Sequence, residues 1–253
     1  MTNDSEKRAP ALPVHDRAGG SSSSRTAPVL ILGGGIGGLA TALALARHGI
    51  ASRVLERRAE FETEGAGIQL GPNGTRILAE LGVAEGLEPL AGKPDAIHAR
   101  DALSGATLAR MPLGQWIAER HGAPYWVAHR SDLHGALLAR VRAEPSITLQ
   151  LDFEANRIDD AGGTVTVHDA HGRDHSGTAV IAADGIRSRT REDQFDGGPM
   201  RYAGKSAARA VIRASDMPAE IAENATQIWL SPRAHVVHYP VRGGREVAIV
   251  FVR

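Results

Sequence analysis

The sequence predicts an α/β fold in which a parallel sheet covered by helices is interleaved with an antiparallel sheet. An apolar run at 29–32 leads into a glycine-rich turn and then into apolar residues at helical spacing. A strand, turn and helix of this kind are typical of a parallel sheet. Short apolar runs between 208 and 252, separated by turn residues, indicate antiparallel strands. The order of these elements predicts that the two sheets alternate along the chain.

The turn at 33–38 is the most informative motif. Gly33, Gly35 and Gly38 match G-x-G-x-x-G, in which the glycines allow a tight turn, close approach to a pyrophosphate and close helix packing. The helix that follows offers unpaired N–H groups and a positive dipole end to phosphates. The helix is expected to stop at Gly49. The motif therefore predicts a Rossmann-like site for an adenine dinucleotide, and an ordinary glycine-rich turn is the alternative.

The second strand, 53–55, is followed directly by Glu56. Its spacing from the glycines is that of an acid that hydrogen-bonds an adenosine ribose. Arg57 and Arg58 follow and could pair with the 2′-phosphate of NADP. Because the acid comes first and would repel that phosphate, FAD or NAD is favoured and the arginines are expected at the surface.

Further elements are predicted in order along the chain. A loop is expected at 61–73, because it contains three glycines and a proline. A hairpin is expected over 96–111 and a helix capped by Ser131 ends before Pro145. Strands are expected at 147–151, 164–168, 178–183, 208–213, 227–230, 235–239 and 246–252.

The composition excludes several classes of function. The 253 residues include 29 basic and 29 acidic side chains, so no net charge favours nucleic acid or an anionic membrane. There is no cysteine, which excludes disulfides, Fe–S clusters and thiolate metal sites, and no metal is expected. Aromatic residues are 4%, too few for stacking on single-stranded nucleic acid. A cytoplasmic location is expected. Residues 1–27 lack the apolar centre of a secretory signal and are expected to form a disordered tail.

Several segments together resemble the single-component FAD-dependent aromatic hydroxylases of the p-hydroxybenzoate hydroxylase type. Within them, the chain is most similar to the salicylate and 3-hydroxybenzoate hydroxylase branch. The segments are Gly33–Gly38 with Glu56 and Arg57, Gly65–Asn73, His129–His134, Ala182–Ser188 and Pro232–Gly244.

The resemblance implies a set of cofactor residues. The pyrophosphate of FAD would lie on the glycine turn, the adenosine ribose on Glu56, and the flavin beside the loop that begins at Gly65. Asp184 and Gly185 would lie near the pyrophosphate and are also linked in the family to the nicotinamide cofactor. The complete implied set is Gly33, Gly35, Ile36, Gly38, Glu56, Arg57, Ala66, Gly67, Ile68, Gln69, Arg130, Asp184 and Gly185.

His235 and Tyr239 are the expected catalytic residues. On a strand, His235, Val237 and Tyr239 share one face and His238 points to the other. Four residues of strand span about 13 Å, so the two side chains could bracket a ring but could not touch one atom. In the branch that the chain resembles, the matching histidine assists phenol deprotonation. Two side chains of a half-buried sheet without a catalytic role are the alternative.

The implied activity is hydroxylation of a phenolic aromatic acid with NADH or NADPH and O₂ through a flavin hydroperoxide. The FAD-binding part is expected at 28–95 and 115–195, and the substrate-binding sheet at 96–114 and 196–253. A homodimer is the expected assembly. Two alternatives remain: a non-catalytic FAD-binding fragment or partner-dependent module, and another flavoprotein such as a halogenase or epoxidase.

The resemblance reaches only the front portion of a family member. The family continues with a further flavin motif and C-terminal helices, and the sequence ends inside a predicted strand. An unpaired apolar edge is expected there.

Overall fold

The computed structural model describes residues 27–61 and 65–253. The tail expected over 1–27 lies, apart from Ala27, outside the described residues. The described part contains one parallel sheet, one large mixed sheet, two small antiparallel sheets and helices packed between them.

The parallel sheet is the centre of the first half. Its strands lie in the order β11 (Ala179–Ala182), β1 (Val29–Leu32), β2 (Ser52–Leu55) and β7 (Ile147–Gln150). All neighbours are parallel, with Leu32 beside both Ala182 and Leu55. All four residues of β1 are buried, which explains why that strand is a continuous apolar run.

Two long helices cover this sheet. They are α1 (Ile36–Arg47) and α5 (Arg130–Arg142), which pack on each other. Leu39 and Leu43 of α1 and Leu133 and Leu137 of α5 are at most 2% exposed and belong to one core with Ile31. The remaining helices are α2 (Pro72–Glu80), α3 (Ala84–Leu87), α4 (Gly114–His121) and α6 (Arg189–Phe195), with 3₁₀ turns at Glu88–Leu90, Ala214–Asp216, Ala219–Ile221 and Arg242–Gly244.

The larger sheet has six strands in the order β12, β15, β14, β13, β4, β5. Their bounds are β12 (Ala207–Arg213), β15 (Glu246–Val252), β14 (His235–Val241), β13 (Ala225–Leu230), β4 (Ala96–Asp101) and β5 (Thr107–Pro112). The expected unpaired edge at β15 is wrong, because β12 and β14 flank it on both sides. The sheet is antiparallel except where β4 runs parallel to β13, since a long stretch of chain separates them.

The two small sheets show where sequence patterns were too weak. β3 (Gly67–Leu70) lies inside the segment 61–73 that was predicted to be a loop, and it pairs with β6 (Trp126–His129). A second sheet joins β8 (Ala155–Asp160), β9 (Val165–Asp169) and β10 (Asp174–Gly177), of which only β9 was predicted. The helix expected to begin after Ser131 begins earlier, at Arg130. The Ser131 hydroxyl does not cap this helix but lies 2.6 Å from Nδ1 of His129.

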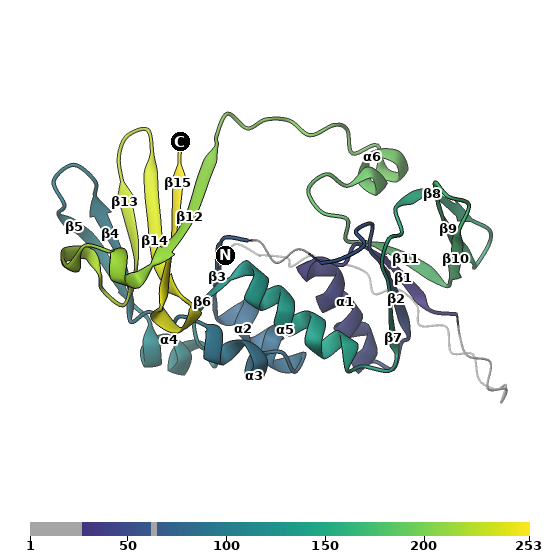
Figure 1. The fold of residues 1–253 in the computed structure, drawn as a ribbon, viewed down its shortest axis with the longest axis horizontal. Helices are drawn as coiled ribbons and strands as arrows, with labels where there is room; N and C mark the ends of the chain where they lie inside the picture. The colour runs from purple at the N-terminus through teal and green to yellow at the C-terminus, as the bar shows by residue number, and fades with distance from the viewer. Residues whose placement is uncertain (1–26, 62–64) are drawn as a thin grey trace, which may run out of the picture.

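The two main sheets lie at opposite ends of the molecule (Figure 1), with α1, α2 and α5 between them. A long connection from α6 to β12 runs from one end to the other (Figure 1). The pair β3–β6 lies where the helical layer meets the six-stranded sheet, because β6 contacts β14.

Candidate functional site

The parallel sheet contains a point where the chain reverses direction across the sheet. From β1 the chain passes to β2 on one side and returns much later to β11 on the other. Ligands of such sheets bind beyond the carboxyl ends of the strands at this switch point. The turn after β1 begins at Gly33, and the turn after β11 leads into Asp184 and Gly185. The two predicted cofactor segments therefore meet here.

The glycine turn is shaped by contacts that exclude side chains. Gly33 has φ +104, and a Cβ there would lie 2.5 Å from the carbonyl oxygen of Ala183. A Cβ on Gly38 would overlap the carbonyl oxygen of Gly33, whereas one on Gly35 would meet nothing within 4 Å. Gly33 and Gly38 thus serve the packing of the turn. Gly35, the N-cap of α1 with no side-chain cap, faces open space and leaves the first N–H groups of the helix to a ligand.

Glu56 fixes the other side of this turn. It is 7% exposed, and its Oε2 accepts from Gly34 N at 2.7 Å while its Oε1 accepts from Arg58 N at 3.0 Å. Each carboxylate oxygen can accept further hydrogen bonds. Glu56 therefore keeps acceptor capacity beside the glycine turn, and it ties the end of β2 to that turn.

Asp184 is an ionised acceptor at the opposite wall. Burial raises the pKa of Asp184. Hydrogen bonds from the hydroxyls of Ser188 and Thr190 and from the N–H of Thr190 together have a larger, lowering effect, so that the net pKa lies below its ordinary value. Its Oδ2 accepts from Thr190 Oγ1 at 2.9 Å. Gly185, with φ +85, lets the chain turn away directly after it.

These walls enclose two cavities that share Gly35, Ala183, Asp184 and Gly185. One, of about 210 Å³, also reaches Gly33, Glu56 and Arg57. The other, of about 510 Å³, also reaches Ile36 and Arg130. The shared wall makes them neighbouring parts of one groove, which we call the dinucleotide groove. It passes over the glycine turn from an acid suited to a ribose to the first residue of α5.

The residues of the dinucleotide groove fit FAD. The open Cβ position of Gly35 provides room for a pyrophosphate, and the α1 N-terminus provides its donors. Glu56 and Asp184 provide acceptors for hydroxyl groups on either side of it. Arg130 places a cation at the other end.

The segment 66–69 connects this groove with the six-stranded sheet. Ala66 accepts at 2.9 Å from Arg130 N. A Cβ on Gly67 would lie 2.5 Å from both Tyr239 Cε2 and Ala248 Cβ, so that the backbone of Gly67 lies flat against Tyr239. Ile68 packs into the main core, and the Gln69 side chain accepts from Tyr125 at 2.6 Å. Ala66 is thus bonded to the first residue of α5, and Gly67 contacts the six-stranded sheet.

Tyr239 and His235 lie on the same face of β14, as expected, and His238 and Pro240 line a cavity on the other. Tyr239 is 3% exposed; burial, with a smaller contribution from Tyr125, raises its pKa to about 12. His235 lies at the far end of the strand, opposite Leu230 and Val252. The structure therefore brings Tyr239, and not His235, into contact with Gly67.

Three groups of site residues were missed by sequence reasoning. Tyr125 donates a hydrogen bond to Gln69 and also contributes to the raised pKa of Tyr239. His134 donates from Nε2 to the carbonyl of Gly34 at 2.8 Å, and Ser188 and Thr190 hold Asp184. His134 lies one helical turn after Arg130, within the segment His129–His134 that carries the family resemblance, so its place near the turn was predictable from its spacing. Nothing in the sequence pattern marked Tyr125.

Comparisons with known proteins agree with this geometry. Residues 26–251 match the family model described as FAD binding domain. The 3-hydroxybenzoate 6-hydroxylase of Polaromonas naphthalenivorans is 43% identical over 88% of this chain and 56% of the relative. The enzyme of that name from Klebsiella oxytoca is 38% identical over 87% of the chain and 55% of the relative. The chain thus spans a little more than half the length of these relatives.

A solved structure shows the same architecture. Klebsiella pneumoniae HpxO, in complex with FAD and uric acid, superposes with a TM-score of 0.78 at 27% identity, over 89% of this chain and 56% of that one. The fold and the dinucleotide groove define a flavin-dependent protein of the Rossmann type. The chain belongs to the FAD-binding domain family.

Among residues 27–61 and 65–253, no helix combines the length and apolarity needed to span a membrane. Within the same residues, no three His, Asp or Glu side chains are grouped in a way that could bind a metal ion.

Proposed function

We propose that this chain forms the FAD-binding and substrate-binding parts of a monooxygenase that hydroxylates a phenolic aromatic acid, of the salicylate or 3-hydroxybenzoate type, with NAD(P)H and O₂. The observation that carries the proposal is the contact between Gly67 and Tyr239. It joins the dinucleotide groove to the face of the sheet that carries His235. Relatives named 3-hydroxybenzoate 6-hydroxylase support this substrate class.

The chain's own residues have separate tasks in this proposal. The glycine turn, Glu56 and Asp184 bind the cofactor. His235 accepts the phenol proton, a role that suits an imidazole because its ring nitrogen can accept a proton. Tyr239, whose pKa of about 12 keeps its hydroxyl protonated, positions the ring as a hydrogen-bond donor. The bound flavin supplies acceptance of hydride from NAD(P)H and activation of O₂.

The proposal extends to organisation. We propose that residues 28–95 and 115–195 form the FAD-binding part and that 96–114 and 196–253 form the substrate-binding part. A cytoplasmic homodimer is proposed as the working form, and the lack of cysteine suits a reducing compartment.

The test is a titration of the purified chain. It is reconstituted with FAD, and the flavin absorbance is followed while 3-hydroxybenzoate or benzoate is added. We expect a saturable change with 3-hydroxybenzoate, weaker with benzoate because the hydroxyl is missing. His235→Ala should weaken the response at least about tenfold, or about 1.4 kcal/mol. His121→Ala, an exposed residue of α4, is the matched control.

The outcomes separate the alternatives. A chain that binds FAD but responds equally to both acids contradicts the hydroxylase and supports a module that only binds FAD. A colourless chain contradicts both. A halogenase needs a lysine that faces a tunnel. It is disfavoured here because Lys93, one of two lysines in the described residues, is paired with Glu88 at 2.8 Å, on the far side of the sheet from His235.

A further inference from the structure

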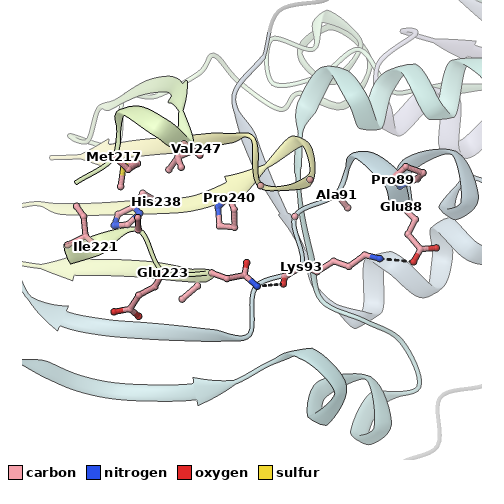
Figure 2. Close-up of a pocket in the computed structure, with 17 residues that line it drawn as sticks. Glu88, Pro89, Ala91, Lys93, Met217, Ile221, Glu223, His238, Pro240 and Val247 are labelled. Carbon is pink, nitrogen blue, oxygen red and sulfur yellow. Dashed lines mark hydrogen bonds and ion pairs between the residues drawn. The ribbon is translucent and has the colours of Figure 1, made fainter. Parts of the chain in front are cut away.

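A cavity of about 620 Å³ lies against the face of the six-stranded sheet opposite to His235 and Tyr239. Side chains alternate along β14, so His238 and Pro240 point into this second face. We call this cavity the outer pocket (Figure 2). The proposed hydroxylation does not use it.

The walls of the outer pocket combine apolar and polar residues and come from distant parts of the chain. They combine the segment 88–93 after α3, the segment 214–225 between β12 and β13, and strands β14 and β15. The apolar part of the lining includes Pro89, Ala91, Met217, Ile221, Pro240 and Val247 (Figure 2). Such a lining, at this volume, is typical of small-molecule sites.

The charged side chains of the outer pocket are already paired. Lys93 Nζ lies 2.8 Å from Glu88 Oε1. Glu223 lies 2.8 Å from Arg100 Nη2 and 2.9 Å from His98 Nδ1. Because each charge has a partner of opposite sign or a histidine, the lining offers no unbalanced cation to an anionic ligand.

His238 is the polar group in this lining that lacks a complete set of partners. His238 is only 6% exposed, and its Nε2 has no hydrogen-bond partner among the described residues. Burial, together with the nearby Arg100, lowers its pKa against the opposing effect of Glu223, so the imidazole is neutral near pH 7. A buried polar group left unpaired costs about 1–3 kcal/mol.

Gln227, beside His238, is a second buried side chain with a polar atom that lacks a hydrogen-bond partner among the described residues. It lies directly opposite His238 in the β13–β14 pairing and is fully buried. Its Oε1 accepts from Arg100 at 2.7 Å, but its Nε2 has no partner within the described part of the chain. Gln227 lies beneath the lining, and His238 is the unpaired group that faces the cavity. An unpaired group in this position points to a ligand with a hydrogen-bonding group.

We propose that the outer pocket binds an uncharged, mainly apolar molecule of aromatic size that carries one hydroxyl or carbonyl group, with His238 as its hydrogen-bond partner. The neutral lining selects against a carboxylate, so this ligand class differs from the phenolic acid proposed for the other face. The inference does not depend on the proposed oxygenation.

The test uses 2-naphthol as the probe and isothermal titration of the full chain as the measurement. We expect saturable binding of 2-naphthol at one site and at least tenfold weaker binding of 2-naphthoate. His238→Phe keeps a flat ring but removes the hydrogen bond, and we expect it to weaken 2-naphthol binding at least tenfold. His121→Phe, at an exposed position of α4, is the matched control and should leave binding unchanged.

A second variant protects the test against a folding defect. Ala222 is exposed and lines the pocket, so that Ala222→Trp should fill the cavity without changing the core and should abolish binding. Thermal melts establish that each variant is folded. The proposal is overturned if 2-naphthol does not bind, if 2-naphthoate binds as well, if Ala222→Trp leaves binding intact, or if His121→Phe removes it.

Discussion

Gly35 and Gly38 lie in one turn, but a side chain at each position would meet different surroundings. The position of Gly38 is filled by the carbonyl of Gly33, and the position of Gly35 opens into the dinucleotide groove. The fold requires glycine at position 38, and we propose that the ligand requires it at position 35.

Gly35→Ala and Gly38→Ala should therefore separate stability from cofactor binding. Gly35→Ala should change the free energy of unfolding by no more than about 1 kcal/mol, the usual effect at an N-cap, yet weaken FAD binding at least tenfold. Gly38→Ala should destabilise the protein by about 1–3 kcal/mol through overpacking. Urea unfolding and flavin fluorescence titration measure the two effects. Gly135→Ala, open within 4 Å on α5, is the control; equal loss of stability in both variants would refute this division.

Glu56→Gln tests the ribose acid. The amide would face two N–H donors with a single acceptor oxygen in place of the two oxygens that now accept from Gly34 and Arg58. We expect FAD to bind about tenfold more weakly, about 1.4 kcal/mol, and the melting temperature of the free chain to fall. Glu85→Gln, at an exposed position, should do neither. An unchanged FAD affinity would remove Glu56 from the site.

Tyr239 should make the stability depend on alkaline pH. Its pKa is raised from 10.0 to about 12, so the unfolded chain ionises before the folded one. The resulting stability is complete below pH 10 and is lost as the pH rises toward about 12. Tyr239→Phe should therefore reduce the drop in melting temperature between about pH 9 and about pH 11. Tyr202→Phe, at a position 79% exposed, should leave the drop unchanged, and an equal effect of both would contradict this explanation.

At the scale of elements, β3 is held between two neighbours. It pairs with β6 on one side, and Gly67 lies against Tyr239 and Ala248 of the six-stranded sheet. A strand in this position couples the segment beside the groove to the proposed substrate face. Any side chain at position 67 would push β3 away from the six-stranded sheet.

Gly67→Ala should lower the free energy of unfolding by about 1–3 kcal/mol, because backbone and a buried ring cannot both yield without strain. Tyr239→Ala in the same chain should recover part of that loss by making room. The measurement is urea unfolding of both single variants and the double variant, which forms a double-mutant cycle. Gly74→Ala, whose Cβ would meet Leu70 at an ordinary 4.0 Å, is the control. Additive effects of the two substitutions would show that Gly67 and Tyr239 do not interact.

For the molecule as a whole, the dinucleotide groove draws on segments far apart in sequence. The turn at 33–38, the start of α5 at Arg130 and the turn at 184–185 line the same groove. One bound ligand should therefore stabilise all of them together.

FAD at about 100 times its dissociation constant should stabilise the chain by about 2.7 kcal/mol. Amide hydrogen exchange should slow at 33–38, 65–69 and 184–185 in the same titration. The hairpin β4–β5, remote from the groove in Figure 1, should exchange unchanged. Protection confined to 33–38 would contradict a ligand that spans the groove.

The sequence by itself determined the parallel core and one end of the site. The strand–turn–helix at 29–47 and Glu56 were predictable because their signals are local: a buried strand must be apolar, and a tight phosphate-binding turn must be glycine. The alternation on β14 was predictable for the same reason, because a strand fixes which side chains share a face. β3 and β8 were missed because short half-exposed strands are stabilised by their partners more than by their own residues.

Only the tertiary structure decided which distant residues meet. The contacts of Tyr239 with Gly67 and of His134 with Gly34 join segments that no sequence period relates. The same is true of the outer pocket, where His238 became significant only when its partners proved to be lacking among the described residues. Local chemistry fixes an element from its own residues, whereas packing between elements fixes the site, because burial and pairing depend on the neighbours that the fold brings close.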